Sequence, residues 1–317
     1  MKITELLEQK KSPFFSFEIL PPLKGKSIQS VYDILDPLME FQPPFINVTY
    51  HRAEYTYKMM PGGYYRKVTT RKRPGTVSIC ASIMNRYKVE AVPHLTCGGF
   101  SVEETEDALI DLHYIGVTNV LALRGDALKS EKTFSPEPGG HTYASELVAQ
   151  IKNMNNGIYL EGDLQNAYKT NFCIGVAGYP EMHFEAPNYK ANLRHLKQKV
   201  DNGADFIVTQ LFFNNEKFHQ FVKDCRAEGI TIPIIPGLKP LTKKVQLTNL
   251  PKIFYVEIPE ELRKAVEACS NDAEVQQVGI EWSVQQCKDL ITNGYNCLHY
   301  YTMGQTEVMT KIAKTVL

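Results

Sequence analysis

The sequence predicts an α/β protein that folds as a single (β/α)8 barrel, a TIM barrel, over residues 1–317. About eight short runs rich in β-branched and aromatic residues are apolar throughout, which is typical of parallel strands covered on both faces. Segments with helical periodicity separate these runs, and no linker or internal repeat interrupts the series. Alternation of this kind over most of a chain favours a barrel over a doubly wound open sheet.

The expected strands and helices follow one another in chain order. Strands are expected at residues 14–20, 45–50, 89–97, 119–126, 172–180, 206–213, 232–238 and 297–302. Helices are expected at residues 27–41, 101–116, 144–154 and 188–204, and at 261–270 and 274–294 before the last strand. Ser101 and Glu104 form a capping-box pattern, and Gly116 and Gly203 mark helix ends.

Two long loops, residues 51–75 and 127–142, follow strands, which places them on the catalytic face of a barrel. The first loop carries a basic run, Arg66 to Arg73, next to Tyr64 and Tyr65. We interpret this run as part of a solvated loop. Binding of a nucleotide phosphate or of RNA is the alternative interpretation.

The overall charge argues against polyanionic partners. Lys and Arg number 35, as do Asp and Glu, so the net charge is zero and supplies no general attraction to nucleic acid or anionic lipid. The first residues are polar and lack the apolar stretch of a secretory signal, and no segment has the ~18 uninterrupted apolar residues of a membrane span. We therefore expect a cytoplasmic protein with neither nucleic acid nor membrane as a partner.

The seven cysteines form no Cys-x-x-Cys pair, and several lie inside apolar runs. Reduced, buried thiols fit this distribution. A catalytic thiol at Cys97, at the end of an expected strand, is the alternative.

Polar residues recur near the carboxyl ends of the expected strands, and these ends converge in a barrel. They are Glu18, Thr49, His94, Thr96, Arg124, Asp126, Glu181, His183 and Gln210. A charged group in an apolar run costs several kcal/mol to bury unless it is paired or used. Taken singly, each is also explained as a rim residue or a satisfied core polar group. Together they favour one shared site.

Within this set, Glu18 is flanked by Phe and Ile, which disfavours its charged form and makes it a candidate general acid. A carboxylate paired with a nearby Lys or Arg is the alternative. Arg124, Gly125 and Asp126 combine a cation, a glycine and a carboxylate, which suits a large anionic ligand and its reactive ring, or forms a salt bridge within the loop.

Several common sites are missing from the sequence. His51, His183 and His195 lack the spacing of a metal site, so we predict no metal. The chain also has no Walker A loop, no G-x-S-x-G elbow and no G-x-G-x-x-G after a strand. A bound dinucleotide would therefore not be held in the Rossmann manner.

Eight ordered motifs resemble the methylenetetrahydrofolate reductase family. They are SFEILPP (16–22), INVTY (46–50), PHLTC (93–97), ALRGD (122–126), YASELV (143–148), GYPEMH (178–183), KVDNGADFIVTQLFF (199–213) and IIPGLKP (234–240). The resemblance covers nearly the whole chain, and the length is similar to that of the bacterial form, which consists of the catalytic domain alone.

This resemblance implies that residues 1–317 form one FAD-binding (β/α)8 catalytic domain. The implied reaction is the reduction of 5,10-methylenetetrahydrofolate to 5-methyltetrahydrofolate, which supplies methyl groups for methionine synthesis. NADH or NADPH gives a hydride to flavin N5 and leaves, and the folate then takes its place in a ping-pong relay. The family also forms homo-oligomers, so a homo-oligomer is implied here.

The resemblance also implies residue roles. Glu18 corresponds to the general acid that opens the imidazolidine ring, and Asp126 to the aspartate near flavin and pterin. The implied substrate contacts are Glu18, Thr49, Asp126, Gln210, Gln246 and Gln305. The implied FAD contacts are Thr49, Tyr50, His94, Arg124, Gly125, Asp126, Ala144, Tyr179, His183, Ala186, Asn192, His195 and Lys199.

Three positions depart from the family pattern. Asn192 replaces an acidic residue near the FAD adenosine, and Gly304-Gln305 replaces an Asn-Arg pair, which removes a candidate cation for the glutamate tail of folate. His51-Arg52 and the basic loop replace Gly-Ala after the second strand. We hypothesise that Arg66 to Arg73 bears on the choice between NADPH and NADH.

Two other functions remain open. Glu18 and Asp126 also suit an acid/base pair in a flavin-free barrel enzyme acting on a phosphorylated or sugar substrate. A folate- or flavin-binding storage or interaction protein would instead keep Glu18 as a structural carboxylate.

Overall fold

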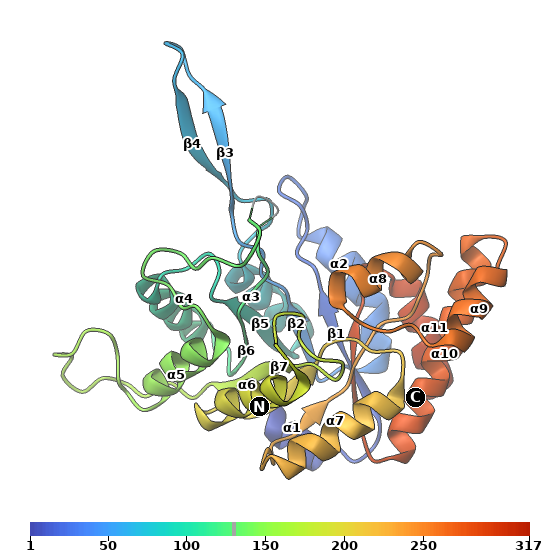
Figure 1. Ribbon diagram of the computed structural model, residues 1–317. Coiled ribbons are helices and arrows are strands. Elements are labelled where there is room, and N and C mark those ends of the chain that lie inside the picture. The colour runs from blue at the N-terminus through green and yellow to red at the C-terminus, as the bar shows by residue number, and fades with distance from the viewer. Residues whose placement is uncertain (129–130) are drawn as a thin grey trace.

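The computed structural model describes residues 1–128 and 131–317, and it is a parallel barrel surrounded by helices (Figure 1). Within the described residues the main sheet has the order β10-β11-β1-β2-β5-β6-β7-β8-β9. The strands of this sheet are β1 (Phe14–Ile19), β2 (Phe45–Val48), β5 (Glu90–Thr96), β6 (Asn119–Leu123), β7 (Cys173–Gly178), β8 (Phe206–Thr209), β9 (Ile234–Ile235), β10 (Gly237–Leu238) and β11 (Cys297–Tyr301). The strand pairs of this sheet in the described residues are all parallel.

The predicted (β/α)8 barrel is confirmed. Its sheet has nine strands where eight were expected, because the seventh expected strand is divided into two short strands. Residues 232–238 form one extended segment that Pro236 divides into β9 and β10. β9 pairs with β8, and β10 pairs with β11, so this single segment bridges the two sides of the sheet. Proline lacks the N–H that a continuous ladder needs, which accounts for the division.

Helices surround the sheet in the expected alternation (Figure 1). They are α1 (Ile3–Gln9), α2 (Gln29–Leu35), the 3-10 helix η1 (Asp36–Phe41), α3 (Thr76–Tyr87), α4 (Val102–Tyr114), α5 (Ala144–Asn155), α6 (Tyr189–Asp201), α7 (Asn215–Ala227), α8 (Gln246–Phe254), α9 (Glu260–Ala268), α10 (Asp272–Thr292) and α11 (Thr306–Val316). The expected helix at 27–41 is divided at Pro37, where α2 gives way to η1. The capping box of Ser101 and Glu104 is present at the start of α4.

Alternate residues of each strand enter two different cores. Residues such as Phe17, Ile46 and Ile174 pack between sheet and helices, while Phe14, Phe45 and Phe206 fill the barrel interior. Ile3 of α1 joins the interior cluster, so α1 closes the amino-terminal end of the barrel. The polar side chains are thereby left at the carboxyl-terminal end, which is the catalytic end of this fold.

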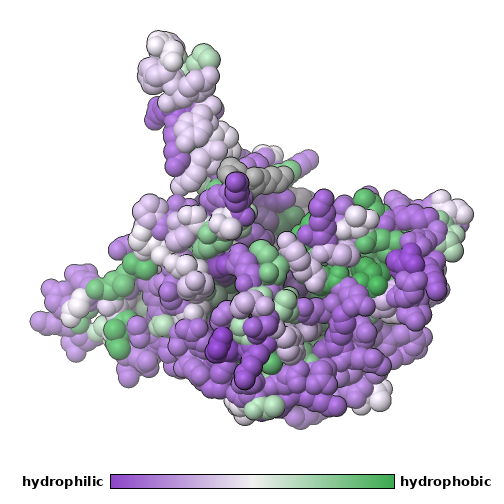
Figure 2. Space-filling model, in the orientation of Figure 1, coloured by the Kyte–Doolittle hydropathy of each residue, from purple (hydrophilic) through white to green (hydrophobic). Residues whose placement is uncertain are grey.

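The interpretation of residues 51–75 as a solvated loop is wrong in one respect. This segment contains an antiparallel hairpin of β3 (Glu54–Met59) and β4 (Tyr65–Thr70), which stands clear of the barrel (Figures 1 and 2). Its side chains are largely exposed, including Tyr57 and Met59. Alternating β-formers on both sides of a Pro-Gly-Gly turn explain the pairing.

All seven cysteines are free and buried, as predicted. Among the described helices, none combines the length and the apolar character needed to cross a membrane.

The close approach of α10 to the loop after β10 gives a stability prediction. A Cβ on Gly279 would overlap the backbone carbonyl of Leu241, which cannot move as a flexible side chain can. We expect Gly279→Ala to lower the free energy of unfolding by about 2 kcal/mol or more, although alanine favours a helix interior. Urea unfolding measures the change. Gln285→Ala, at an exposed position of α10, is the matched control, and equal stability of both variants would contradict the prediction.

Candidate active site

The carboxyl ends of the strands bring the predicted polar residues to one end of the barrel. Glu18 lies near the end of β1, beside Tyr301 of β11 on one side and Asn47 of β2 on the other. His94 lies in β5, and Gln210 directly follows β8. These positions contribute to a shared polar layer above the apolar interior.

Glu18 is largely buried, and no Lys or Arg of the described residues pairs with it. Its side chain is 13% exposed, and burial raises its pKa to about 8. The nearest polar side chain is His94, whose Nε2 lies 3.5 Å from Glu18 Oε2. Burial lowers the pKa of His94 to about 3. At neutral pH both groups are therefore uncharged, and Glu18 holds the proton, so this contact is not an ion pair.

The polar side chains beside and below Glu18 include two atoms without a hydrogen-bond partner among the described residues. Asn47 Nδ2 lies 3.4 Å from His94 Nε2, and Ser16 Oγ lies 2.9 Å from His299 Nδ1. Asn47 Oδ1 and His299 Nε2 are buried and have no hydrogen-bond partner among the described residues. Buried polar atoms are rarely left unpaired, so these atoms are suited to a ligand that enters the barrel.

Tyr301 is a site residue that the sequence reasoning missed. Its hydroxyl donates a 2.6 Å hydrogen bond to the carbonyl of Thr209, and burial raises its pKa well above the usual range, with Glu18 contributing. The sequence signal for Tyr301 is its place after Tyr300, as the second of two aromatic residues at the carboxyl end of the last strand. Gln210 lies beside it along the rim, where its Oε1 accepts a 2.9 Å hydrogen bond from the Leu211 N–H.

Arg124, Gly125 and Asp126 follow β6, beyond its last residue. Arg124 forms an ion pair with Glu185 and lies over the Phe134 ring at 5.0 Å. Gly125 has a φ of +84°, and a Cβ there would lie 3.3 Å from Thr96, so both conformation and space favour glycine. Asp126 is exposed, and Arg124 pairs with Glu185 and not with Asp126, so the alternative of a salt bridge within the loop is wrong.

A second cation lies under the segment after β7. Lys199 of α6 donates to the carbonyl of Ala177, its Nζ lies 5.9 Å from the Tyr179 ring, and burial lowers its pKa to about 8. His183 packs on Tyr179 at 4.7 Å, and burial lowers its pKa to about 4. Asn192 is occupied in holding this segment, since it donates to the Tyr179 carbonyl at 3.2 Å and accepts from the His183 N–H at 3.1 Å.

The remaining predicted cofactor residues follow β2 or lie on or next to the helices α5 and α6. Thr49 and Tyr50 follow β2, and the Tyr50 ring lies 4.9 Å from Phe100. Ala144 is the first residue of α5, and Ala186 is buried before α6. His195 is exposed on α6.

Two predicted substrate glutamines lie at helix starts. Gln246 begins α8, and its Oε1 accepts hydrogen bonds from the N–H groups of Thr242 (2.7 Å) and Lys243 (3.1 Å). Gln305 precedes α11, and its N–H donates to the Thr302 carbonyl at 2.8 Å. In this structure the Gln246 side chain therefore stabilises the turn at residues 242–246, directly before α8.

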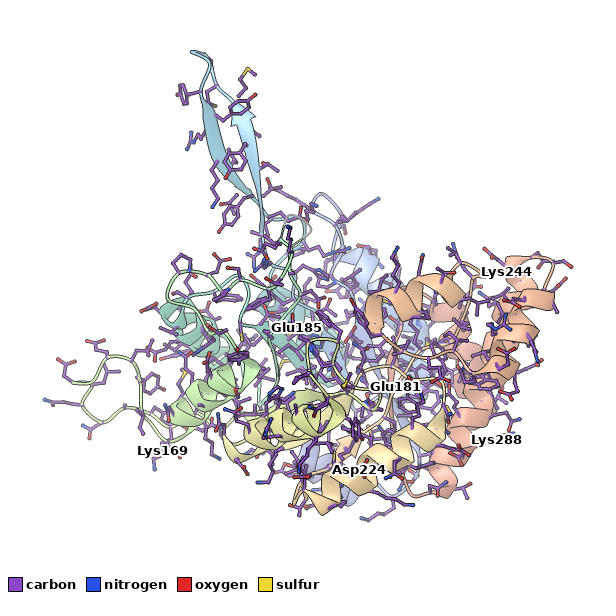
Figure 3. All side chains as sticks on the ribbon, in the orientation of Figure 1. Lys169, Glu181, Glu185, Asp224, Lys244 and Lys288 are labelled. Atoms are coloured by element: carbon purple, nitrogen blue, oxygen red, sulfur yellow. The ribbon has the colours of Figure 1, made fainter. Side chains whose placement is uncertain are left out.

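Glu181 serves a structural role. It accepts hydrogen bonds from Lys217 Nζ at 3.1 Å and from the Glu257 N–H at 2.9 Å, which ties the segment after β7 to α7 and to the loop before α9 (Figure 3).

The structure gives no support to the alternative of a thiol nucleophile. Burial raises the pKa of Cys97 to about 12, which keeps it a neutral thiol. The described residues contain no cluster of three metal-ligating side chains.

The polar rim divides into two halves. Arg124 and the rings of Tyr50 and Tyr179 follow β6, β2 and β7, and Lys199 of α6 reaches β7, whereas the side of β8, β10, β11 and β1 carries Gln210, Tyr301 and Glu18. Cations and N–H groups hold phosphates, and aromatic faces pack on flat rings. The first half therefore suits a phosphate-bearing cofactor, and the second half offers a proton donor to a substrate beside it.

Several known proteins are similar to this chain in sequence. Methylenetetrahydrofolate reductase 2 of Saccharomyces cerevisiae is 34% identical over 313 residues, which cover 96% of this chain and 48% of that protein. The 5,10-methylenetetrahydrofolate reductase of Escherichia coli K12 is 31% identical over 302 residues, which cover 95% of this chain and 90% of that protein. The chain thus spans about half the length of the first and nearly all of the second.

A solved structure shares the fold. A protein from Clostridium thermocellum, described as binding two copies of 5-methyl-5,6,7,8-tetrahydrofolic acid, has a TM-score of 0.57 with 12% identity, covering 98% of this chain and 97% of its own. Residues 2–316 match the family model described as methylenetetrahydrofolate reductase. Because this match covers almost the whole chain, the chain belongs to the methylenetetrahydrofolate reductase family.

Proposed function

We propose that this protein reduces 5,10-methylenetetrahydrofolate to 5-methyltetrahydrofolate, with FAD as cofactor and NADH or NADPH as electron donor. The observation that carries the proposal is the protonated Glu18, buried at the barrel mouth against a neutral His94. A carboxylic acid that keeps its proton at neutral pH is what general-acid catalysis on a folate nitrogen needs.

The residues around the first half of the rim fit FAD. Arg124 and Lys199 supply positive charge for a pyrophosphate, and Tyr50 and Tyr179 supply aromatic surface. Asn47 Oδ1 and His299 Nε2 are further unpaired polar atoms in the barrel. When bound there, FAD would take a hydride from the nicotinamide and pass it to the folate.

The protein's own groups then act on the folate. Glu18 donates its proton to an imidazolidine nitrogen of the folate, which promotes ring opening to a cationic iminium. Asp126, exposed at the end of β6, supplies negative charge that favours the cation. Gln210 offers an amide to the pterin. Thr49 is proposed to contact the nicotinamide, and Gln246 and Gln305 are proposed substrate contacts that require movement of the side chain or of the loop.

The proposal extends to the cellular setting. It assigns the enzyme to the cytoplasm, as a homo-oligomer that supplies methyl groups for methionine synthesis. The seven buried free thiols are consistent with a reducing compartment.

A visible absorption spectrum of the purified protein tests the proposal. We expect a flavin band that bleaches on anaerobic addition of NADH or NADPH and returns with methylenetetrahydrofolate. A protein that stays colourless after incubation with FAD would contradict it and favour flavin-free acid/base chemistry by Glu18 and Asp126. A flavin band with binding of folate but no turnover, unchanged by Glu18→Gln, would favour a binding protein.

Glu18→Gln separates the two half-reactions. Because Glu18 acts only on the folate, we expect flavin reduction by nicotinamide to be retained and the folate half-reaction to slow by about 10²- to 10⁴-fold. In the wild type the folate half-reaction should slow as the pH rises through about 8, where Glu18 loses its proton. Stopped-flow absorbance measures both steps. Equal losses in both half-reactions, or an unchanged pH profile in the variant, would argue against the acid role.

Within the basic run from Arg66 to Arg73, we propose Arg71 as the residue that bears on the choice between NADPH and NADH. Arg73 bonds to the Pro21 carbonyl and Lys72 pairs with Glu54, whereas Arg66 lies on the projecting hairpin. Burial raises the pKa of Tyr50, and the positive charge of Arg71 opposes this rise, so Arg71 lies near this residue of the rim.

We expect Arg71→Ala to lower kcat/KM for NADPH about tenfold more than for NADH, because a guanidinium binds the additional phosphate of NADPH. Steady-state kinetics with both cofactors measure the ratio. Arg66→Ala is the matched control and should leave it unchanged. An unaltered NADPH-to-NADH ratio in Arg71→Ala would exclude the hypothesis.

A further inference from the structure

Lys239 is a buried lysine at the rim of the barrel, directly after β10. It is only 4% exposed. Burial lowers its pKa to about 8, and no charged neighbour contributes to this shift. Within residues 1–128 and 131–317, no hydrogen bond or ion pair involves its Nζ.

Three other cations of the described residues bond to groups within the fold. Lys199 donates to the Ala177 carbonyl. Arg52 is paired with Glu131, and Lys217, which is more exposed, bridges Glu181 and Glu257. The stem of Lys239 is buried, while its Nζ is not among the fully buried atoms that lack a partner in the described residues, so the ammonium group is open to a ligand at the rim.

The strand register places Lys239 beside the proposed substrate. Leu238 pairs with Tyr300 and packs in the core between sheet and helices. Gly237 lies on the opposite face, where a Cβ would come within 2.8 Å of the Tyr301 ring. Alternation along the chain puts Lys239 on this inner face. It thus follows the strand that lies between Gln210 on one side and Tyr301 and Glu18 on the other.

We propose that Lys239 binds a carboxylate of the glutamate moiety of the folate. The inference rests on the proposed function, and it gives a role to a lysine of the IIPGLKP motif (234–240) to which the resemblance assigned none. Glutamate carboxylates are the negatively charged groups of this substrate at neutral pH. Gln210, Tyr301 and Gln305 on this half of the rim are neutral, so Lys239 supplies the cation that Gln305 does not.

The proposal predicts opposite effects of one substitution on stability and on binding. In Lys239→Met a side chain of similar shape replaces the buried charge, so the ligand-free protein should unfold at a higher temperature. The same variant should bind 5-methyltetrahydrofolate about tenfold or more weakly, because a charge-assisted hydrogen bond is lost. Lys239→Arg should retain most of the binding.

Calorimetric titration of the flavin-loaded protein with two ligands identifies the group that Lys239 contacts. The ligands are 5-methyltetrahydrofolate and the matching tetrahydropteroate, which has no glutamate. We expect Lys239→Met to weaken binding of the first and to leave binding of the second unchanged. Lys243→Met, an exposed neighbour, is the control and should change neither affinity nor melting temperature.

Three outcomes would overturn the proposal. Equal affinity of wild type and Lys239→Met for 5-methyltetrahydrofolate would remove Lys239 from the binding site. An equal loss with both ligands would move its contact to the pterin or aminobenzoyl part. A lower melting temperature in Lys239→Met would make the lysine structural. Failure of the wild type to bind 5-methyltetrahydrofolate at all would instead refute the proposed function.

Discussion

Closure of the sheet at its seventh strand is the constraint on which the site depends. Pro236 interrupts that strand, and the residues on its two sides pair with different neighbours. Gly237 makes the second pairing possible, because a Cβ there would overlap the Thr209 carbonyl and come within 2.8 Å of Tyr301. Without this approach β11 and β8 would remain edges of an open sheet, and Glu18 and Gln210 would not share a rim.

Closure also determines the electrostatics of Glu18. Phe14, Phe45 and Phe206 fill the interior below the polar layer, and α1 closes the amino-terminal end, so water has little access from that side. A carboxyl group at the upper edge of this apolar filling keeps its proton, and His94 beside it stays neutral for the same reason. The acid is therefore produced by the packing beneath it, with no nearby anion required.

The sequence predicted the barrel well because its strands are apolar on both faces. All eight expected strands were found, with ends that differ by a few residues. The hairpin was missed because its second strand carries charged residues such as Arg66 and Lys67. The alternation of Tyr55, Tyr57 and Met59 on the first strand therefore had no apolar counterpart in the sequence. An isolated two-stranded hairpin gains little from a shared core, so hydrophobic pattern is a weak guide to it.

The site was predictable only where the chemistry shows in the local sequence. Glu18 was recognisable from its apolar neighbours, and Arg124 from its place after a strand. Nothing local distinguishes Lys239 in PGLKP from a surface lysine, since its burial comes from the neighbouring strands that closure brings together. The same holds for Asn192, whose amide is used by the backbone of Tyr179 and His183.

The two buried lysines show why burial alone does not define a role. Lys199 and Lys239 have similarly lowered pKa values, to about 8, and both follow from desolvation. Lys199 is bonded to the Ala177 carbonyl, so part of its desolvation cost is offset within the fold. Lys239 has no such bond among the described residues, so its desolvation cost is offset further when an acceptor binds. A residue of this second kind lowers the stability of the free protein and strengthens binding, which is the relation expected between stability and function at a binding site.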